Sequence, residues 1–321
     1  MNSKDKIKTL LQPTLLALSL AYSLSTTHHT IAQEADDLGV LVMAHGGSLE
    51  WNQGVLDTVA PLTEEYTLEV AFGMADAVSM QEAVARLEER GADRIAVVRL
   101  FISGESWYER TEQILGMKEG APDRTAATAA VDEHAGHTMP AATDVATGQP
   151  AAMGHSMEFW KIDTEARFAL SKPGLAEAEE MSEVLLARAA ALSKNPTQED
   201  VLILAHGPGD DAENARWIAY IEERVARLRT DHPFRSVKVA TLREDWEEKR
   251  VGAEQEVRAF VDNAKATGGT AIVIPYRVHG FGPYAEVLEG LDYVADEQGL
   301  IPHAGVTRWI AGQIEELHAD L

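Results

Sequence analysis

The stretch "LGVLVMAHGGS", residues 38–48, returns later in the chain as "EDVLILAHGPGD", residues 199–210. Each copy is an apolar run of strand length that ends in Ala-His-Gly. A short apolar run bounded by turn residues is typical of a strand that is buried on both faces of a parallel sheet. Because the pattern occurs twice, the sequence predicts two related α/β halves, each the size of a small domain.

Helix-like and strand-like segments alternate after each copy. Further strand candidates are "TLEVAFG" and "DRIAVVRLFISG" in the first half, and "SVKVATL" and "TAIVIPYRVHG" in the second. Acidic amphipathic segments separate them, and this alternation predicts parallel sheets that helices cover on both faces. We therefore expect an N-terminal half over residues 36–192, a linker over 193–200 and a C-terminal half over 201–321.

The N-terminus has the pattern of an export signal. Lys4, Lys6 and Lys8 precede an apolar run, and "TIA" at Thr30–Ala32 offers small residues at which a peptidase can cut. The apolar run is short for a membrane span. We therefore predict a signal peptide over residues 1–32, an exported, periplasmic protein, and no stable membrane span after its removal; an uncleaved anchor is the alternative.

Charge and cysteine content narrow the range of partners. The chain has a formal net charge of -24, which argues against nucleic acid because binding to phosphates needs a basic face. The same charge suits a cationic partner, and it also serves solubility. Since the chain has no cysteine, any metal must bind through His, Met, Asp or Glu.

Two histidines, His45 and His206, stand where the first strand of each half meets the following loop. Ligands of open parallel sheets bind beyond the carboxyl ends of the strands, and an imidazole there can bind a metal or carry a proton. Gly46 and Gly207 allow a sharp turn and a close approach of the backbone to a ligand. The alternative is a histidine that only forms hydrogen bonds within its loop.

Further candidates follow the other strands. His279 comes after the third strand of the second half and Glu244 after its second strand, so that His206, His279 and Glu244 can form a site for a divalent first-row metal. Glu105 holds the third-strand position of the first half, where we expect an ordinary solvated carboxylate. His303 is a weaker candidate near the last strand. The tryptophans at helical positions are expected to serve packing: Trp51, Trp217, Trp246 and Trp309.

Residues 121–157 differ from the rest of the chain in composition, being rich in Ala, Thr, Gly, Pro, His and Met. A loop of this length inside a compact domain is usually functional or disordered. Thioether and imidazole groups together favour soft or borderline metals such as copper, nickel and cobalt. We therefore interpret the segment as a metal-binding loop, with a disordered linker as the alternative. Its candidate ligands are His134, His137, Met139, Met153, His155 and Met157.

The motifs "VLVMAHGGS" and "VLILAHGPG" resemble the strand-and-histidine signature of the sirohydrochlorin chelatases, the class II chelatases. The stretch "VAFGMADAVSMQEAVARLEERGADRIAVVRLFISG" is similar to the family's second strand, helix and third strand. The resemblance implies two flavodoxin-like halves with a cleft between them, and strand-end histidines that bind metal and tetrapyrrole. It matches His45 and His206 to the first-strand histidine and His279 approximately to the third-strand histidine. The family's carboxylate position falls on Met74, with Glu244 as a looser counterpart in the second half.

Two functions fit these patterns. The resemblance implies a lyase-type metal chelatase that inserts a divalent metal, cobalt before copper, nickel or iron, into a sirohydrochlorin-like tetrapyrrole. Its catalytic residues are expected to be His206, His279 and His45, with Glu244 as a further metal ligand. The alternative is an exported metal-binding protein that has the same fold and no chelatase activity.

Overall fold

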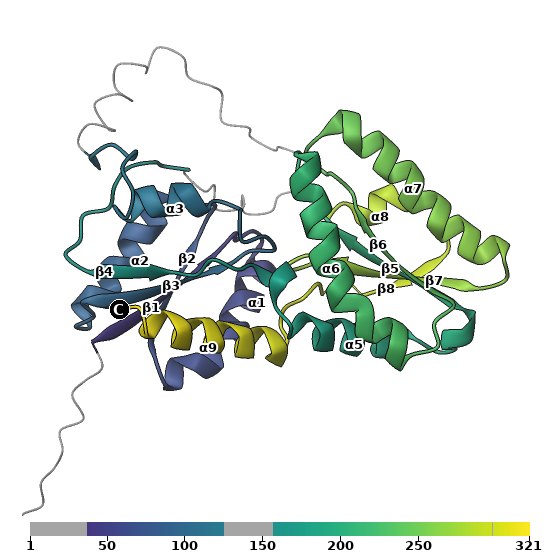
Figure 1. The fold of residues 1–321 in the computed structure, drawn as a ribbon, viewed down its shortest axis with the longest axis horizontal. Coiled ribbons are helices and arrows are strands. Elements are labelled where there is room, and N and C mark those ends of the chain that lie inside the picture. The colour runs from purple at the N-terminus through teal and green to yellow at the C-terminus, as the bar shows by residue number, and fades with distance from the viewer. Residues whose placement is uncertain (1–36, 125–156, 297) are drawn as a thin grey trace, which may run out of the picture. The chain divides into compact units, whose positions relative to one another are not determined.

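Two four-stranded sheets, parallel throughout, form the framework of the chain (Figure 1). The computed structural model describes residues 37–124, 157–296 and 298–321. The strand order has the same form in both sheets, β2-β1-β3-β4 and β6-β5-β7-β8, so the predicted class of two similar α/β halves with parallel sheets is confirmed. The strands are β1 Leu38–Ala44, β2 Thr67–Phe72, β3 Arg94–Leu100, β4 Arg167–Leu170, β5 Glu199–Ala205, β6 Ser236–Thr241, β7 Thr270–Tyr276 and β8 Tyr293–Ala295.

Several helices begin where a short polar side chain accepts one of the first backbone N–H groups. Ser48 accepts from the N–H of Trp51 at the start of α1, Asp76 caps α2, and Asp210 caps α6. The helices of the described residues are α1 Leu49–Val59, α2 Ala77–Glu89, α3 Tyr108–Ile114, α5 Met181–Leu192, α6 Asp211–Asp231, α7 Glu247–Ala266, α8 Tyr284–Val287 and α9 Ala304–His318, with 3-10 turns η1 Ala60–Glu64, η2 Leu175–Glu177 and η3 Pro196–Gln198.

The central strands β1 and β5 are buried along their whole length, as their apolar sequences predict. Strand β5 nevertheless begins with two carboxylates, Glu199 and Asp200, which the sequence placed in the linker. Glu199 accepts hydrogen bonds from the Ser193 hydroxyl and from the backbone N–H of Lys194, and Asp200 pairs with Arg235. Both buried carboxylates therefore have polar partners that compensate their removal from water.

Two helices pack against the sheet of the other half of the chain. Helix α5 lies within residues 36–192 but packs against α6 and β7, and α9 lies within residues 201–321 but packs against α1 and β3 (Figure 1). The Thr307 hydroxyl of α9 donates to the Thr58 carbonyl oxygen of α1 over 2.8 Å. One hydrophobic cluster accordingly contains residues of both sheets and of both helices.

No helix in the described part of the chain is long and apolar enough to cross a membrane. The predicted signal peptide, residues 1–32, lies outside the described residues, so export stays a prediction.

The shared core makes a specific prediction for α9. Ile310 is fully buried in the cluster that joins the two sheets, so Ile310→Ala is expected to lower the free energy of unfolding by about 2–5 kcal/mol. Urea denaturation followed by circular dichroism measures the change, and Glu315→Ala, at an exposed position of the same helix, is the control. Because the core is shared, the variant should still unfold in one transition, and two separate transitions would contradict this arrangement.

Candidate functional site

The two strand-end histidines are held in the same way. Nδ1 of His45 lies 2.7 Å from the carbonyl oxygen of Gly46, and Nδ1 of His206 lies 2.8 Å from that of Gly207. A carbonyl oxygen only accepts, so in each ring Nδ1 carries the hydrogen and donates it. The other nitrogen, Nε2, is therefore the one that can take up a proton or bind a metal.

The glycine after each histidine makes this contact possible. Gly46 and Gly207 have φ of 72° and 78°, the left-handed region that residues with a Cβ adopt only at a cost. A Cβ on Gly207 would also lie 2.6 Å from the Cβ of Thr241. The Ala-His-Gly motif thus directs the histidine side chain as well as ending the strand.

A tryptophan lies beside each histidine. The Trp51 and His45 rings are stacked with centroids 5.4 Å apart, and the Trp246 and His206 rings meet edge to face at 6.1 Å. Each indole also fills the space over a loop glycine, since a Cβ on Gly47 or Gly209 would collide with the ring of Trp51 or Trp246. Each strand-end imidazole is therefore accompanied by an indole, which comes from α1 in the first half and from the end of the loop after β6 in the second.

Both histidines line one cavity of about 1010 Å³, with residues of both halves in its wall. This volume is at the upper end of the roughly 300–1,000 Å³ of small-molecule sites, and the lining is rich in aromatic rings, as in such sites. Trp217 and Trp309 are buried in the core and Trp51 packs against it, as expected. Trp51, Trp217 and Trp246 in addition line the cavity. The other lining residues used below are Met74, Glu105, Trp107, Glu244, Asp245 and Arg277.

Asp245 is the carboxylate nearest to His206. Its Oδ2 lies 3.0 Å from Nε2 of His206, whereas the nearer oxygen of Glu244 lies 3.9 Å from the same nitrogen. Because Nδ1 of His206 already donates its hydrogen, two lone pairs would face each other across the 3.0 Å contact if Nε2 were bare. A proton on Nε2 removes this repulsion, and a cation shared by Nε2 and the carboxylate does the same.

Glu244, the carboxylate expected to bind metal, is paired with Arg277 in a mostly buried contact. The charge of Arg277 compensates that of Glu244, so less of its negative charge is left for a metal. Burial raises the pKa of the neighbouring Tyr284 well above its ordinary value, and the Glu244 carboxylate raises it further, which keeps the phenol neutral.

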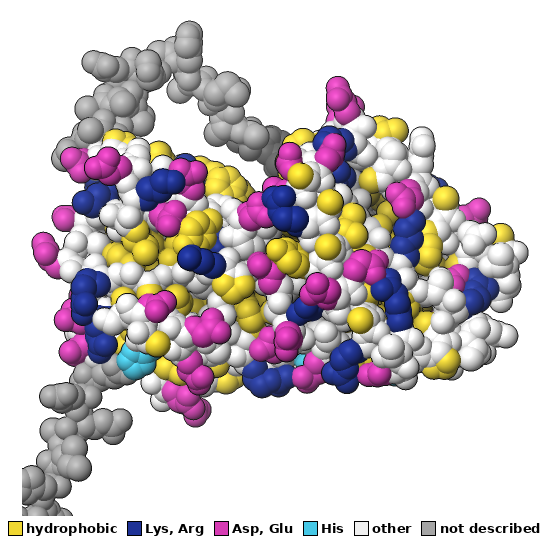
Figure 2. Space-filling view, in the orientation of Figure 1, with side chains coloured by type: hydrophobic (Ala, Val, Ile, Leu, Met, Phe, Trp, Pro, Cys, Tyr) yellow, Lys and Arg dark blue, Asp and Glu magenta, His cyan; other side chains and the backbone are white. Residues whose placement is uncertain are grey.

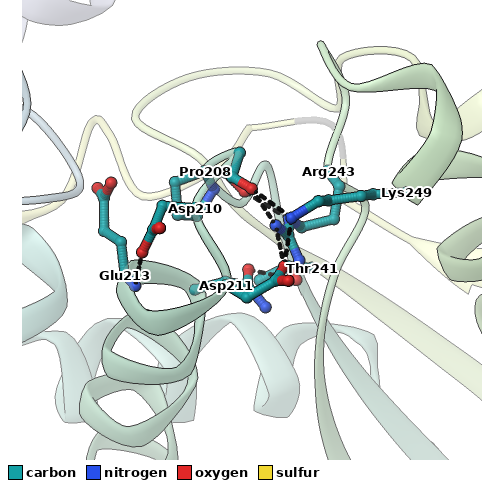
Figure 3. A network of polar contacts seen from close by, with 9 residues as sticks. Pro208, Asp210, Asp211, Glu213, Thr241, Arg243 and Lys249 are labelled. Atoms are coloured by element: carbon teal, nitrogen blue, oxygen red, sulfur yellow. Dashed lines mark hydrogen bonds and ion pairs between the residues drawn. The ribbon is translucent and has the colours of Figure 1, made fainter.

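The loop that carries Glu244 and Asp245 is fixed by Arg243 (Figure 3). Arg243 has φ of 58°; its backbone N–H donates to the His206 carbonyl oxygen over 2.7 Å, and its guanidinium binds the Gly209 carbonyl oxygen at 2.6 Å. Lys249 donates to the same carbonyl over 2.7 Å. The loops after β5 and β6 are thus joined, which holds Asp245 against His206.

His279 and His303 lie elsewhere. His279 packs against Trp51, with ring centroids 5.9 Å apart, and a Cβ on Gly54 would lie 3.0 Å from its ring. It is not among the residues that line the cavity, and burial lowers its pKa. Nδ1 of His303 accepts from the N–H of Gly305 over 3.0 Å, so His303 caps α9. This weaker candidate of the sequence therefore has a structural role.

Glu105 is exposed, as expected for a solvated carboxylate, but it is also paired with a cation. Arg216 of α6 donates to it through Nε and Nη2, each over 2.7 Å. This hydrogen bonding lowers the pKa of Glu105. The pair joins the loop after β3 to the second half at the cavity wall.

Five candidate ligands of the loop 121–157 lie outside the described residues: His134, His137, Met139, Met153 and His155. The sixth, Met157, is described, and its carbonyl oxygen accepts from Nη2 of Arg110 over 2.7 Å. Among residues 37–124, 157–296 and 298–321, no group of three His, Asp or Glu side chains is arranged to hold a metal ion. The metal ligands predicted from the sequence therefore stay predictions.

Asp245 and Trp107 are cavity residues that the sequence did not reveal. Asp245 directly follows Glu244, and only the fold decides which of the two faces His206. Trp107 has φ of 58°, a backbone outlier for a bulky side chain, and no sequence pattern marks it. Adjacent polar residues after a strand indicate that the loop can belong to a site. They do not indicate which of those residues lies in the cavity wall.

Figure 2 shows acidic and basic side chains interspersed over the face in view. On this face the excess of negative charge is therefore spread out, as it is in proteins whose charge serves solubility.

Comparison with known proteins identifies the fold. No family model and no curated protein matches the chain in sequence. Among solved structures, SirB from Bacillus subtilis with Fe3+ matches with a TM-score of 0.56 at 14% identity, over 87% of this chain and 94% of SirB. The cobalt complex of the sirohydrochlorin chelatase SirB from B. subtilis subspecies spizizenii matches with 0.53 over the same shares, also at 14% identity.

A third match is DR2241 from Deinococcus radiodurans, a multi-domain protein with structural similarity to chelatases. The TM-score is 0.50 at 15% identity, and the match covers 86% of this chain but only 54% of DR2241. The chain thus has a chelatase-like fold, and it spans about half the length of this relative.

The pair between Glu105 and Arg216 predicts a pH-dependent stability. The folded-state pKa of Glu105 is lowered from 4.5, so its stabilising contribution is present above the unfolded value and is lost as the pH falls through the folded value. Glu105→Gln should lower the urea midpoint modestly at pH 7, because exposed ion pairs contribute little. The difference from the unchanged protein should shrink below pH 4.5, and an equal difference at both pH values would contradict the assignment. Glu119→Gln, at an exposed position, is the control.

Proposed function

We propose that the chain is a metal chelatase that inserts a divalent metal, cobalt foremost, into a sirohydrochlorin-like tetrapyrrole. The observation that carries the proposal is the presence of His45 and His206, with identical backbone contacts, in one aromatic cavity of about 1010 Å³. The chelatase-like fold supports it. A flat conjugated ligand suits a wall of indole rings, which stack on such faces.

In this proposal the second half holds the metal. Nε2 of His206 and the carboxylate of Asp245, 3.0 Å apart, would exchange a proton for the divalent cation, with Glu244 and Arg277 setting the charge behind them. Imidazole and carboxylate together suit cobalt, iron, nickel and copper in their divalent states. The negative charge of the whole chain favours the approach of a cation.

In this proposal the first half removes protons from the tetrapyrrole. A divalent metal that enters the macrocycle displaces two pyrrole N–H protons, and each must pass to a base. Nε2 of His45 is suited to accept one because its Nδ1 hydrogen is held by the Gly46 carbonyl. Asp245 and bulk water are available for the second. Each proton lost balances one of the two positive charges that the metal brings.

We further propose that the segment 121–157 collects metal for this cavity, in an exported protein. Its end is tied beside the cavity wall: Nε of Arg110 donates to the Ala75 carbonyl oxygen over 2.8 Å and its Nη2 donates to that of Met157. Ala75 directly follows Met74, which lines the cavity. Tethered ligands raise the local concentration of the metal that they bind.

A second function has its own support. Glu244 is neutralised by Arg277, and the first half has Met74 in place of a carboxylate at its second-strand loop. Both features suit an exported metal-binding protein without chelatase activity. Tight metal binding by the purified protein, together with no metal insertion, would favour this function over the first.

The chelatase proposal predicts distinct effects of four substitutions on the rate of cobalt insertion into sirohydrochlorin, followed by absorbance. His206→Ala should lower the rate by about 100-fold or more, as expected for loss of a ligand and proton carrier, and Asp245→Asn by about 10–100-fold. His279→Ala tests the sequence prediction that His279 is catalytic, since a packing residue would change stability but not the rate. His318→Ala, on the exposed end of α9, is the control. A rate for His206→Ala equal to that of the control would refute the proposal.

The loop proposal predicts that deletion of residues 125–156 lowers the number of copper or cobalt ions bound per chain, measured by equilibrium dialysis and elemental analysis. Insertion at saturating metal should persist in the deletion variant, since His206 and Asp245 are retained. Unchanged metal binding after the deletion would show that the segment has no part in collecting metal.

A further inference from the structure

The two halves differ in chemistry where their second strands end. The backbone pairing is equivalent, because the N–H of Gly73 donates to the Ala44 carbonyl oxygen over 2.8 Å and that of Leu242 donates to Ala205 over 2.9 Å. From this shared point the second half places Asp245 against its histidine. The first half instead places Met74 in the cavity wall.

The carboxylate in the first half's loop serves another purpose. Asp76 is 4% exposed; its oxygens accept from the N–H of Ser79 over 2.9 Å, at the start of α2, and from the N–H of Glu158 over 2.8 Å. It therefore caps a helix and anchors a neighbouring segment. In this loop it is Met74 that lines the cavity, and its side chain carries a thioether, a soft metal ligand.

The backbone holds Met74 in place at a conformational cost. Ala75 has φ of 54°, the left-handed region that an alanine adopts only when its surroundings impose it. The surroundings are Arg110, whose Nε donates to the Ala75 carbonyl oxygen over 2.8 Å and whose guanidinium lies 4.5 Å over the ring of Phe159. A strained turn at a cavity wall is a reason to look for function there.

His45, Met74 and Trp51 all line the same cavity. His45 stands at the end of β1 and Met74 just beyond the neighbouring β2, and both line the cavity with Trp51, whose ring stacks on His45. We infer that His45, Met74 and Trp51 form a binding site for a soft monovalent metal ion, Cu(I) or Ag(I), separate from the His206–Asp245 pair. Thioether and imidazole ligands favour such ions over hard cations, and an indole face attracts a cation.

This soft site does not depend on the proposed chelatase activity. Imidazole and carboxylate at His206 and Asp245 suit borderline divalent ions, whereas imidazole and thioether at His45 and Met74 suit Cu(I). The cavity would then hold two ions of different chemistry on its two walls, and a tetrapyrrole is required by neither.

The test is a titration of the full-length chain with Cu(I), and in parallel with Ag(I), against a chromophoric competitor. All variants carry Ala at the five loop ligands His134, His137, Met139, Met153 and His155, so that these do not contribute. Met74→Leu keeps the volume and removes the sulfur, and is expected to lose one bound Cu(I), or to weaken it at least tenfold. Met117→Leu, at an exposed position outside the cavity wall, should behave as the parent.

A second titration with Co(II) separates the two sites. Asp245→Asn should weaken Co(II) and leave Cu(I) unchanged, while Met74→Leu should do the reverse. Equal Cu(I) binding by Met74→Leu and the parent would overturn the inference, and so would an equal loss of Co(II) and Cu(I) in Met74→Leu. Neither titration uses a tetrapyrrole, so failure of metal insertion and failure of the soft site are told apart.

Discussion

A hydrogen bond from a histidine ring to the carbonyl of the next residue, made possible by a glycine in the left-handed region, orders the site in both halves. Gly46 and Gly207 turn the backbone back on itself, so that Nδ1 of His45 and of His206 is satisfied locally. Nε2 is then the reactive atom of each ring. Without the left-handed turn, the same histidines at the same strand ends would have no fixed tautomer or direction.

The rest of the site is arranged around these two rings. Trp51 and Trp246 pack over loop glycines and against the histidines. Arg243 connects the loop after β6 to the loop after β5 (Figure 3). This connection supports the contact between Asp245 and His206. Rigid support of this kind lets a site discriminate between ligands, because the donor atoms do not have to be ordered on binding.

The similar backbones of the halves carry different chemistry. The loop after the second strand lines the cavity with Met74 in the first half and with Glu244 and Asp245 in the second, and the local carboxylate of the first half, Asp76, caps a helix. One cavity thus has a softer and a harder wall. Helix α5 packs against the sheet of the second half and α9 against the sheet of the first, so that the two halves share one hydrophobic core. The position of one cavity wall therefore depends on that of the other.

The sequence by itself determined the α/β class, the parallel sheets and the two strand-end histidines, because apolar strand length, Ala-His-Gly and helix periodicity are local patterns. Only the tertiary structure decided that α5 and α9 pack across the halves, that Asp245 lies closer to His206 than Glu244 does, and that Glu105 is paired with Arg216. It also placed His279 against Trp51 and four tryptophans in the cavity wall. These outcomes depend on contacts between residues far apart in the chain, where packing and charge compensation select one of several locally equivalent side chains, and no local pattern records that selection.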